Sequence, residues 1–292
     1  MADTDTTVEI ESTPNLIGLF GKAALGALPG FGRSSGHELP GTTYVQPGVR
    51  IDRERLAAYD RVCGFRLSDE LPSTFPHILS FPLQAKLMTD PGFPFPMIGL
   101  VHLANRISQA RPIGAGEALL LRVHAEGLRP HERGTQFDMV SEALVDGEVV
   151  WTDVSTYLRR GGSSGPSERG AKVDGEPLGG EPAARWHLAG DTGRRYAEVS
   201  GDHNPIHLYP LTARLFGFKR AIAHGMWSKA RCLAFFEGRL PERYTVDVRF
   251  KRPILLPAKV ALYSESTEDG FRFALRNAKS DSPHLDGTIS AD

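Results

Sequence analysis

The sequence has few cysteines, almost no net charge and no long hydrophobic run, and each shortage excludes a class of protein. The two cysteines among the 292 residues, Cys63 and Cys232, cannot build a disulfide framework and lack metal-ligand spacing, which fits a reducing cytoplasm. A formal net charge of −1 without a long basic block gives a nucleic-acid partner no electrostatic support. No P-loop or dinucleotide glycine fingerprint stands between a strand and a helix, so we expect no cofactor.

The most apolar stretch, residues 16–28, is shorter than the roughly 20 residues of a membrane span, so we expect no integral span. Acidic residues precede it where a secretory signal would carry basic ones. Leu16 and Phe20 share a face at helical spacing, which predicts a short amphipathic helix that packs on the body; contact with a membrane surface is the alternative.

An internal repeat predicts the architecture. Residues 49–64 and 186–201 each read as a short strand followed by a helix that ends on glycine, with Tyr59 matching Tyr196. Each copy continues with a meander of alternating strands separated by Pro and Gly. The expected strands are 101–107, 118–128, 136–145 and 149–158 in the first copy, and 244–250, 258–264, 271–276 and one near Gly287 in the second. The class is therefore α+β.

Composition suggests boundaries for these units. Residues 161–183 are rich in Gly, Ser and Pro and predict a flexible linker. We therefore divide the chain into an N-terminal segment 1–42 with the short helix, a first unit 43–160, the linker, and a second unit 184–292.

The run Gly201-Asp202-His-Asn204-Pro205-Ile-His207 contains an acid/base pair. A carboxylate and an imidazole stand five positions apart with a turn between them, so both can face one point. Addition of water to an activated double bond needs groups that accept and supply protons, and Asp202 and His207 could do both. The alternative interpretation of this stretch is purely structural: a side-chain-capped turn with an exposed His.

The reaction also needs a donor for charge on a carbonyl oxygen, and Gly225 in Ala223-His224-Gly225-Met226 suits that role. An apolar run of helical spacing follows it, so its N–H is expected at a helix N-terminus with no side chain in the way.

These two motifs resemble the signature of the MaoC-like, R-specific enoyl-thioester hydratases, and the whole chain resembles the two-hotdog 3-hydroxyacyl-thioester dehydratases of actinobacteria. The resemblance implies a double hotdog, in which each antiparallel sheet wraps a central helix. It also implies a catalytic dyad of Asp202 and His207, a supporting Asn204 and an oxyanion-hole amide at Gly225. The expected activity is hydration of trans-2-enoyl thioesters to (R)-3-hydroxyacyl thioesters in fatty acid metabolism, on coenzyme A or acyl carrier protein.

The remaining site predictions are less specific. We place His224, Met226 and Pro205 at the substrate, and expect Lys219 and Arg220 to meet phosphates of the thioester carrier. We expect no metal, because Pro205 between His203 and His207 argues against a helical ligand pair. A homodimer is possible by analogy.

The first copy lacks the dyad and has His77 roughly where His224 stands, with Ile78 in place of the glycine. We expect it to be non-catalytic and to bind the acyl chain with residues 75–87 and 91–96. A hotdog acyl-thioesterase and a non-catalytic acyl-thioester-binding subunit are the alternatives for the whole chain.

Overall fold

The computed structural model describes residues 6–26, 38–161 and 178–292. None of the helices in these ranges is both long enough and apolar enough to cross a membrane. The centre of the predicted linker, residues 162–177, lies outside the described residues. The carbonyl of Leu178, just beyond it, accepts a hydrogen bond from Arg276 at 2.6 Å.

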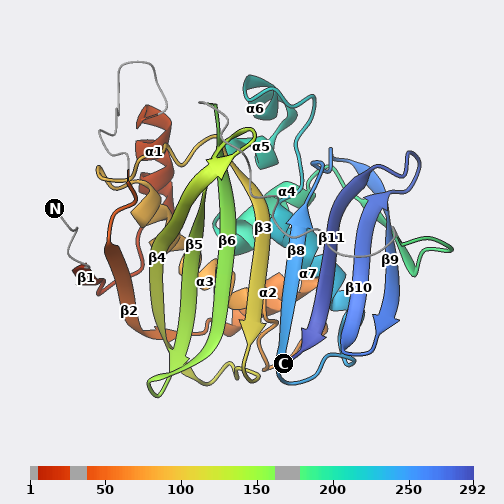
Figure 1. The fold of residues 1–292 in the computed structure, drawn as a ribbon, viewed down its shortest axis with the longest axis horizontal. Coiled ribbons are helices and arrows are strands. Elements are labelled where there is room, and N and C mark those ends of the chain that lie inside the picture. The colour runs from red at the N-terminus through yellow and green to blue at the C-terminus, as the bar shows by residue number, and fades with distance from the viewer. Residues whose placement is uncertain (1–5, 27–37, 162–177) are drawn as a thin grey trace.

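One sheet of eleven strands forms the front layer of the described chain, and the helices pack on its other side (Figure 1). In chain order, the strands of the first half are β2 (Thr42–Arg50), β3 (Leu100–Gln109), β4 (Ala118–His131), β5 (Gly134–Val145) and β6 (Glu148–Arg160). Those of the second half are β7 (Ala184–Leu188), β8 (Tyr244–Phe250), β9 (Ala258–Thr267), β10 (Gly270–Asn277) and β11 (Pro283–Ala291). All the meander strands expected from the sequence are present.

The two halves have the same topology. From the outer edge inward the order is β2-β4-β5-β6-β3 in one half and β7-β9-β10-β11-β8 in the other, so each half places its second strand innermost. These innermost strands pair antiparallel, with Ile107 opposite Val246, and join the halves into one sheet. This repeated arrangement confirms the α+β double hotdog. An additional short strand, β1 (Thr6–Glu9), pairs parallel with β2 at the edge, and the sequence analysis missed it.

Two helices lie at the centre of the halves, α3 (Phe75–Met88) and α7 (Gly225–Phe236), and both are largely buried. Beside them lie the repeat helices α2 (Arg53–Cys63) and α4 (Thr192–Ser200), each of which ends at a glycine in the left-handed conformation, as predicted. Tyr59 and Tyr196 are buried with their ring centroids 6.1 Å apart. The matching tyrosines therefore pack the two repeat helices together in the core.

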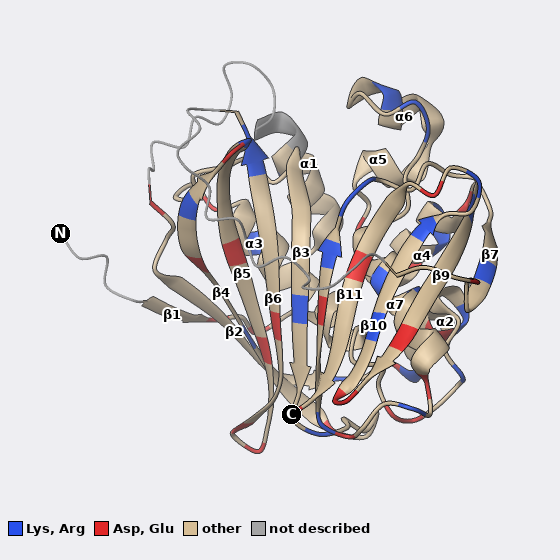
Figure 2. Ribbon diagram, turned by 45° about the vertical axis from the view of Figure 1, so that its right-hand side comes forward, with Lys and Arg blue, Asp and Glu red and all other residues tan. Residues whose placement is uncertain are grey.

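The predicted N-terminal helix is α1 (Leu16–Gly26), whose Phe20 ring packs 6.4 Å from that of Phe81 on α3. Residues 27 and 28, where we expected it to end, lie outside the described residues. Two short helices, α5 (Pro205–Leu208) and α6 (Pro210–Leu215), project from the second half beyond the sheet (Figures 1 and 2).

Lys229 of α7 ties the two innermost strands together. Its side chain is 0 % exposed, and its Nζ donates to the carbonyls of Asn105 on β3 and Val246 on β8 at 3.0 and 3.1 Å. A third bond joins Nζ to Asn105 Oδ1 at 2.5 Å. Burial lowers the pKa of Lys229 to about 7. A buried amine at the junction of the halves thus meets three oxygen acceptors.

The Lys229 contacts extend into the first half. Asn105 Nδ2 donates to Asp153 Oδ1 at 2.6 Å, and the other oxygen of Asp153 pairs with His77 on α3. Burial opposes ionisation of Asp153, yet His77 and Lys229 hold its pKa below the ordinary value. The sequence repeat did not reveal this pair, because its partners lie 76 residues apart.

Replacement of Lys229 by methionine is expected to destabilise the protein strongly. It would leave three buried oxygens without this donor and remove one of the two groups that favour the Asp153 charge; each unsatisfied buried acceptor typically costs about 1–3 kcal/mol. Urea denaturation measures the loss. The control is Lys259→Met on an exposed position of β9, which should change stability by less than about 0.5 kcal/mol. Equal stability of the two variants would contradict the inferred role of Lys229.

Candidate active site

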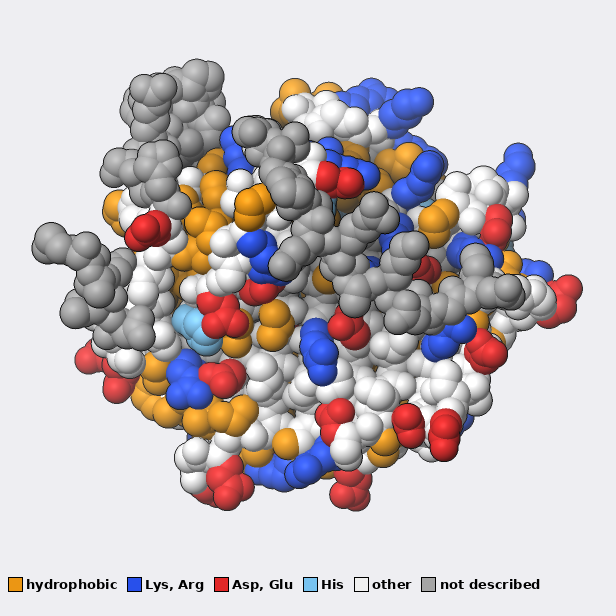
Figure 3. All heavy atoms as spheres, viewed as in Figure 1, with side chains coloured by type: hydrophobic (Ala, Val, Ile, Leu, Met, Phe, Trp, Pro, Cys, Tyr) orange, Lys and Arg blue, Asp and Glu red, His pale blue; other side chains and the backbone are white. Residues whose placement is uncertain are grey.

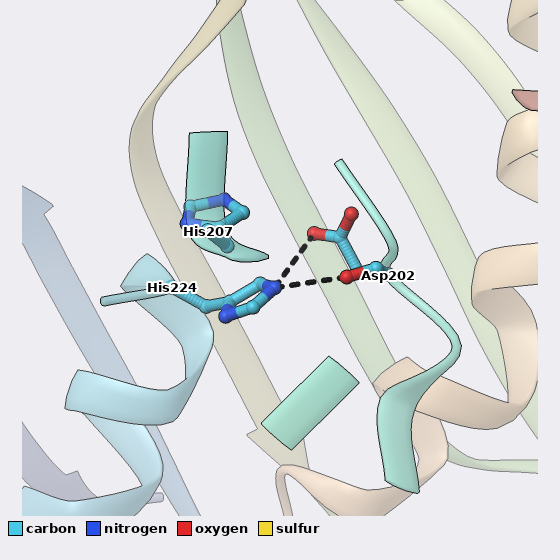
Figure 4. Close-up of side chains that lie close together, drawn as sticks. All are labelled: Asp202, His207 and His224. Carbon is cyan, nitrogen blue, oxygen red and sulfur yellow. Dashed lines mark hydrogen bonds and ion pairs between the residues drawn. The ribbon is translucent and has the colours of Figure 1, made fainter. Parts of the chain in front are cut away.

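Asp202, His207 and His224 come together on the helix side of the second half (Figure 4). Their candidate ligand atoms, one from each residue, all lie within 4.8 Å of one another. Asp202 follows the end of α4, His207 lies on α5 and His224 directly precedes α7. The convergence of Asp202 and His207 expected from their spacing is therefore present.

The turn between Asp202 and His207 is held by local hydrogen bonds. Asp202 Oδ1 accepts from the Asn204 N–H at 3.1 Å, and the Asn204 side chain caps α5 by accepting from the Ile206 N–H at 3.4 Å. Pro205 takes the first position of α5, where its missing N–H costs nothing. Asn204 and Pro205 thus shape the backbone that carries the pair.

His207 is oriented by the main chain. Its Nδ1 lies 2.8 Å from the carbonyl oxygen of Ile222, which can only accept, so Nδ1 carries the proton. In the neutral ring Nε2 is then a free acceptor. Burial lowers the pKa of His207 from 6.5, while the Asp202 charge opposes that shift. The neutral form is therefore favoured near pH 7.

His224 stacks on His207 with ring centroids 3.6 Å apart and planes at 24°. Its Nε2 lies 3.0 Å from the Asp202 carbonyl oxygen and 3.7 Å from the carboxylate. Burial, then the adjacent His207, lowers the pKa of His224 to about 3, so the contact with Asp202 is a hydrogen bond from a neutral ring. This geometry fits a positioning role for His224.

Close backbone packing fixes α5 against α4. A β-carbon on Gly193 would lie 2.1 Å from the carbonyl oxygen of His207, so a larger residue cannot occupy that position without displacing α5. From the first half, Arg55 Nε donates to the carbonyl of Val199 at 2.8 Å, near the end of α4 and just before Asp202. Both halves therefore position the loop that carries the carboxylate.

Gly225 is the first residue of α7, as predicted, and helix geometry leaves its N–H without an acceptor one turn earlier. Phe250, the last residue of β8, packs so closely on it that a β-carbon would lie 3.1 Å from the ring. Met226 is buried, 5 % exposed, and belongs to the core.

Lys219 and Arg220 are exposed and form no hydrogen bond or ion pair with Asp202, His207 or His224, all of which the structure describes. Arg220 donates instead to the Pro257 carbonyl at 3.3 Å. His77 is the third residue of α3, whereas His224 directly precedes α7, so the two histidines differ in position relative to the starts of their helices. Comparison of the two sequence copies could not reveal this difference, because it does not show at which residue each helix begins.

A row of aromatic rings that sequence reasoning missed leads away from Gly225 into the first half. His102 lies 4.9 Å from Phe250 and 4.7 Å from Tyr157 between ring centroids. Phe137 lies 5.8 Å from Tyr157 and equally far from Phe95, in the segment 91–96 that we expected to bind the acyl chain. The rings come from five separate segments, which explains why no local sequence signal revealed the row as a whole.

The same three side chains, Asp202, His207 and His224, are close enough to hold a metal ion. His207 Nδ1 and His224 Nε2 already face main-chain carbonyls, which leaves one nitrogen per ring and the carboxylate. The expectation of a metal-free site stays a prediction; activity that survives a strong chelator would support it.

Comparison with known proteins shows the family of the chain. Residues 175–285 match the family described as MaoC like domain. The 3-hydroxyacyl-thioester dehydratase X of Mycobacterium tuberculosis is 40% identical over 268 residues, which are 92% of this chain and 95% of the relative. The chain belongs to the MaoC-like dehydratase family.

Solved structures of MaoC-like proteins have the same fold. The crystal structure of HtdX of Mycobacterium tuberculosis matches with a TM-score of 0.76 at 39% identity, over 86% of this chain and 100% of that one. A second protein of that organism, described as a double hotdog, matches with a TM-score of 0.53 at 14% identity over 84% of this chain and 93% of its own. The latter likeness concerns the fold alone.

Gly193→Ala is expected to displace α5 and with it His207. Overpacking of this kind typically costs about 1–3 kcal/mol. Thermal denaturation measures the loss, and the His207 imidazole signals in NMR spectra should shift. In the control, Gly116→Ala, the added methyl group meets nothing within 4 Å, so less than about 0.5 kcal/mol is expected. Unchanged His207 signals in Gly193→Ala would contradict the close packing.

The imidazole of His207 is expected to titrate with a midpoint below 6.5, because burial disfavours its charged form. The Asp202 charge partly offsets this effect, so Asp202→Asn should lower the midpoint further. A pH titration followed by NMR of the histidine ring protons tests both statements. A wild-type midpoint at or above 6.5, or an upward shift in the variant, would disprove them.

Proposed function

We propose that this MaoC-like chain is a hydro-lyase that catalyses the reversible hydration of trans-2-enoyl thioesters to (R)-3-hydroxyacyl thioesters. The observation that carries the proposal is the convergence of Asp202 and His207 beside the N-terminus of α7. The name of the relative that is 40% identical, a 3-hydroxyacyl-thioester dehydratase, supports the same reaction.

One water molecule between the Asp202 carboxylate and His207 Nε2 would start the hydration. The neutral His207 ring offers Nε2 as the proton acceptor, because Nδ1 is committed to the Ile222 carbonyl. The hydroxide so formed attacks the β-carbon, and the proton held by the dyad returns to the α-carbon on the same face. One water is consumed, no proton is left over, and dehydration reverses each transfer.

We assign the electrostatic stabilisation of the developing enolate to the N-terminus of α7. Its first N–H, that of Gly225, has no acceptor within the helix and lies at the positive end of the helix dipole. A thioester oxygen placed there would accept this hydrogen bond. Loss of such a donor commonly costs roughly 2.7–4 kcal/mol in the barrier.

The division of labour that we propose assigns the chemistry to residues 184–292 and acyl-chain binding to residues 43–160. The row of rings supports it, since it runs from Phe250 beside Gly225 to Phe95 in the first half. An acyl chain whose thioester oxygen meets Gly225 could extend along these rings.

The substrate is a thioester of coenzyme A or of an acyl carrier protein, and we propose that Lys219 and Arg220 attract the phosphates of the carrier. Both side chains are exposed in the segment that follows α6. A cytoplasmic location fits the two free, buried cysteines, Cys63 and Cys232. The homodimer expected by analogy stays a prediction that light scattering would test.

Asp202→Asn and His207→Gln are each expected to lower kcat/KM for a trans-2-enoyl-CoA by about 10²-fold or more, because each removes a proton-transfer group. Loss of the enoyl absorbance gives the rate, and chiral analysis of the product should give the (R)-alcohol. The matched control is His203→Gln, an exposed neighbour in the same turn, which should stay within about twofold of wild type.

Two results would overturn the proposal. Release of free thiol with the enoyl group intact would assign the chain to the thioesterases. Tight binding of the thioester without any turnover would assign it to non-catalytic binding subunits.

A further inference from the structure

The helix α6 carries an unusual concentration of exposed apolar side chains. Among the described residues, four of the seven large hydrophobic side chains that are exposed lie in residues 209–216. Leu211 and Leu215, one helical turn apart, are 72% and 80% exposed. The other two are Tyr209 and Phe216. We call these four side chains the α6 patch.

Hydrogen bonds and a buried residue on the inner face of α6 fix the helix that carries the α6 patch. Thr212 Oγ1 donates to the carbonyls of Pro205 and Tyr209 at 2.6 and 2.9 Å, and Ala213 on the inner face is 0 % exposed. Arg194 of α4 lies 5.0 Å from the Tyr209 ring and donates to the Leu208 carbonyl at 3.0 Å. The inner face of α6 is thus anchored, whereas Leu211 and Leu215 on its outer face are exposed in the described part of the chain.

Positive charge surrounds the α6 patch without any negative charge from the same segment. The sequence from His203 to Phe236 contains no Asp or Glu, whereas Arg214, Lys219 and Arg220 are exposed. No carboxylate forms an ion pair with these three in the described part of the chain; Arg214 and Arg220 donate to main-chain carbonyls. Figure 3 shows apolar and basic side chains together at the top of the molecule, where Figure 1 draws α6.

The position of the α6 patch connects it with the site. Tyr209 is the residue at which α5 ends and α6 begins, two positions after His207. Whatever docks on the patch is held beside the helix that carries the proposed base.

We propose that the α6 patch docks a small acidic protein that carries the acyl thioester on a flexible prosthetic arm; this inference rests on the proposed function. Free coenzyme A would use the cations but would leave the four apolar side chains in water. An acidic protein with apolar side chains at its centre of contact would use both. A six-residue helix is also short for the apolar face of a membrane-surface helix.

The test compares one trans-2-enoyl acyl group on coenzyme A and on an acyl carrier protein. The double variant Leu211→Glu with Leu215→Glu should lower kcat/KM for the carrier-protein substrate by at least about tenfold and leave the coenzyme A substrate within about twofold. Leu67→Glu, at a 59% exposed leucine outside the patch, should change neither substrate.

The outcomes separate this inference from the proposed function. Equal losses on both substrates, or no loss on either, would overturn the docking role. A lower molar mass of the double variant in light scattering would assign the patch to contacts between copies of the chain. Binding of wild type, but not the variant, to phosphatidylglycerol vesicles, with carrier-protein activity unchanged, would assign it to a membrane. Failure of wild type to hydrate either substrate would instead overturn the proposed function.

Discussion

The antiparallel pairing of β3 with β8 is the constraint on which the rest of the molecule depends. It makes one sheet of two similar halves and sets His102 of the first half beside Phe250 of the second. Strand pairing leaves no freedom to slide, because a one-residue slip would turn every side chain to the other face. Lys229 also connects the two strands, because its Nζ donates a hydrogen bond to a main-chain carbonyl of each. Gly225, at the start of α7, packs against Phe250 at the end of one of these paired strands.

Burial is what makes the paired histidines chemically useful. Two stacked imidazoles cannot both be charged at a centroid distance of 3.6 Å in a buried place without a large cost. The contacts with Ile222 and Asp202 then decide which nitrogen of each neutral ring keeps its proton. Asp202 lies beside them and is only partly buried. The chain thus presents a carboxylate and an unprotonated ring nitrogen to the same small space.

Short-range signals in the sequence were enough for the strands, the two repeat helices with their terminal glycines, and the turn that brings Asp202 to His207. Those features depend on residues a few positions apart, as does the start of α7 at Gly225. The partner of His207 could not be predicted, because it is a main-chain carbonyl, at Ile222, whose position depends on tertiary packing. The same holds for Lys229 and Asp153, which a sequence pattern cannot distinguish from surface charges.

The two halves differ in the hydrogen bonding of the histidine and aspartate side chains that each brings together. In the first, the imidazole of His77 is paired with the buried Asp153, and the remaining oxygen of that carboxylate is bonded to Asn105. In the second, the Asp202 carboxylate accepts from the turn and approaches His224, while His207 keeps one nitrogen free. A fully partnered buried pair rigidifies a core, whereas a partly partnered one leaves an acceptor for water and substrate. The number of hydrogen-bonding atoms that stay without a partner therefore distinguishes a structural cluster from a reactive one, more than the presence of His and Asp does.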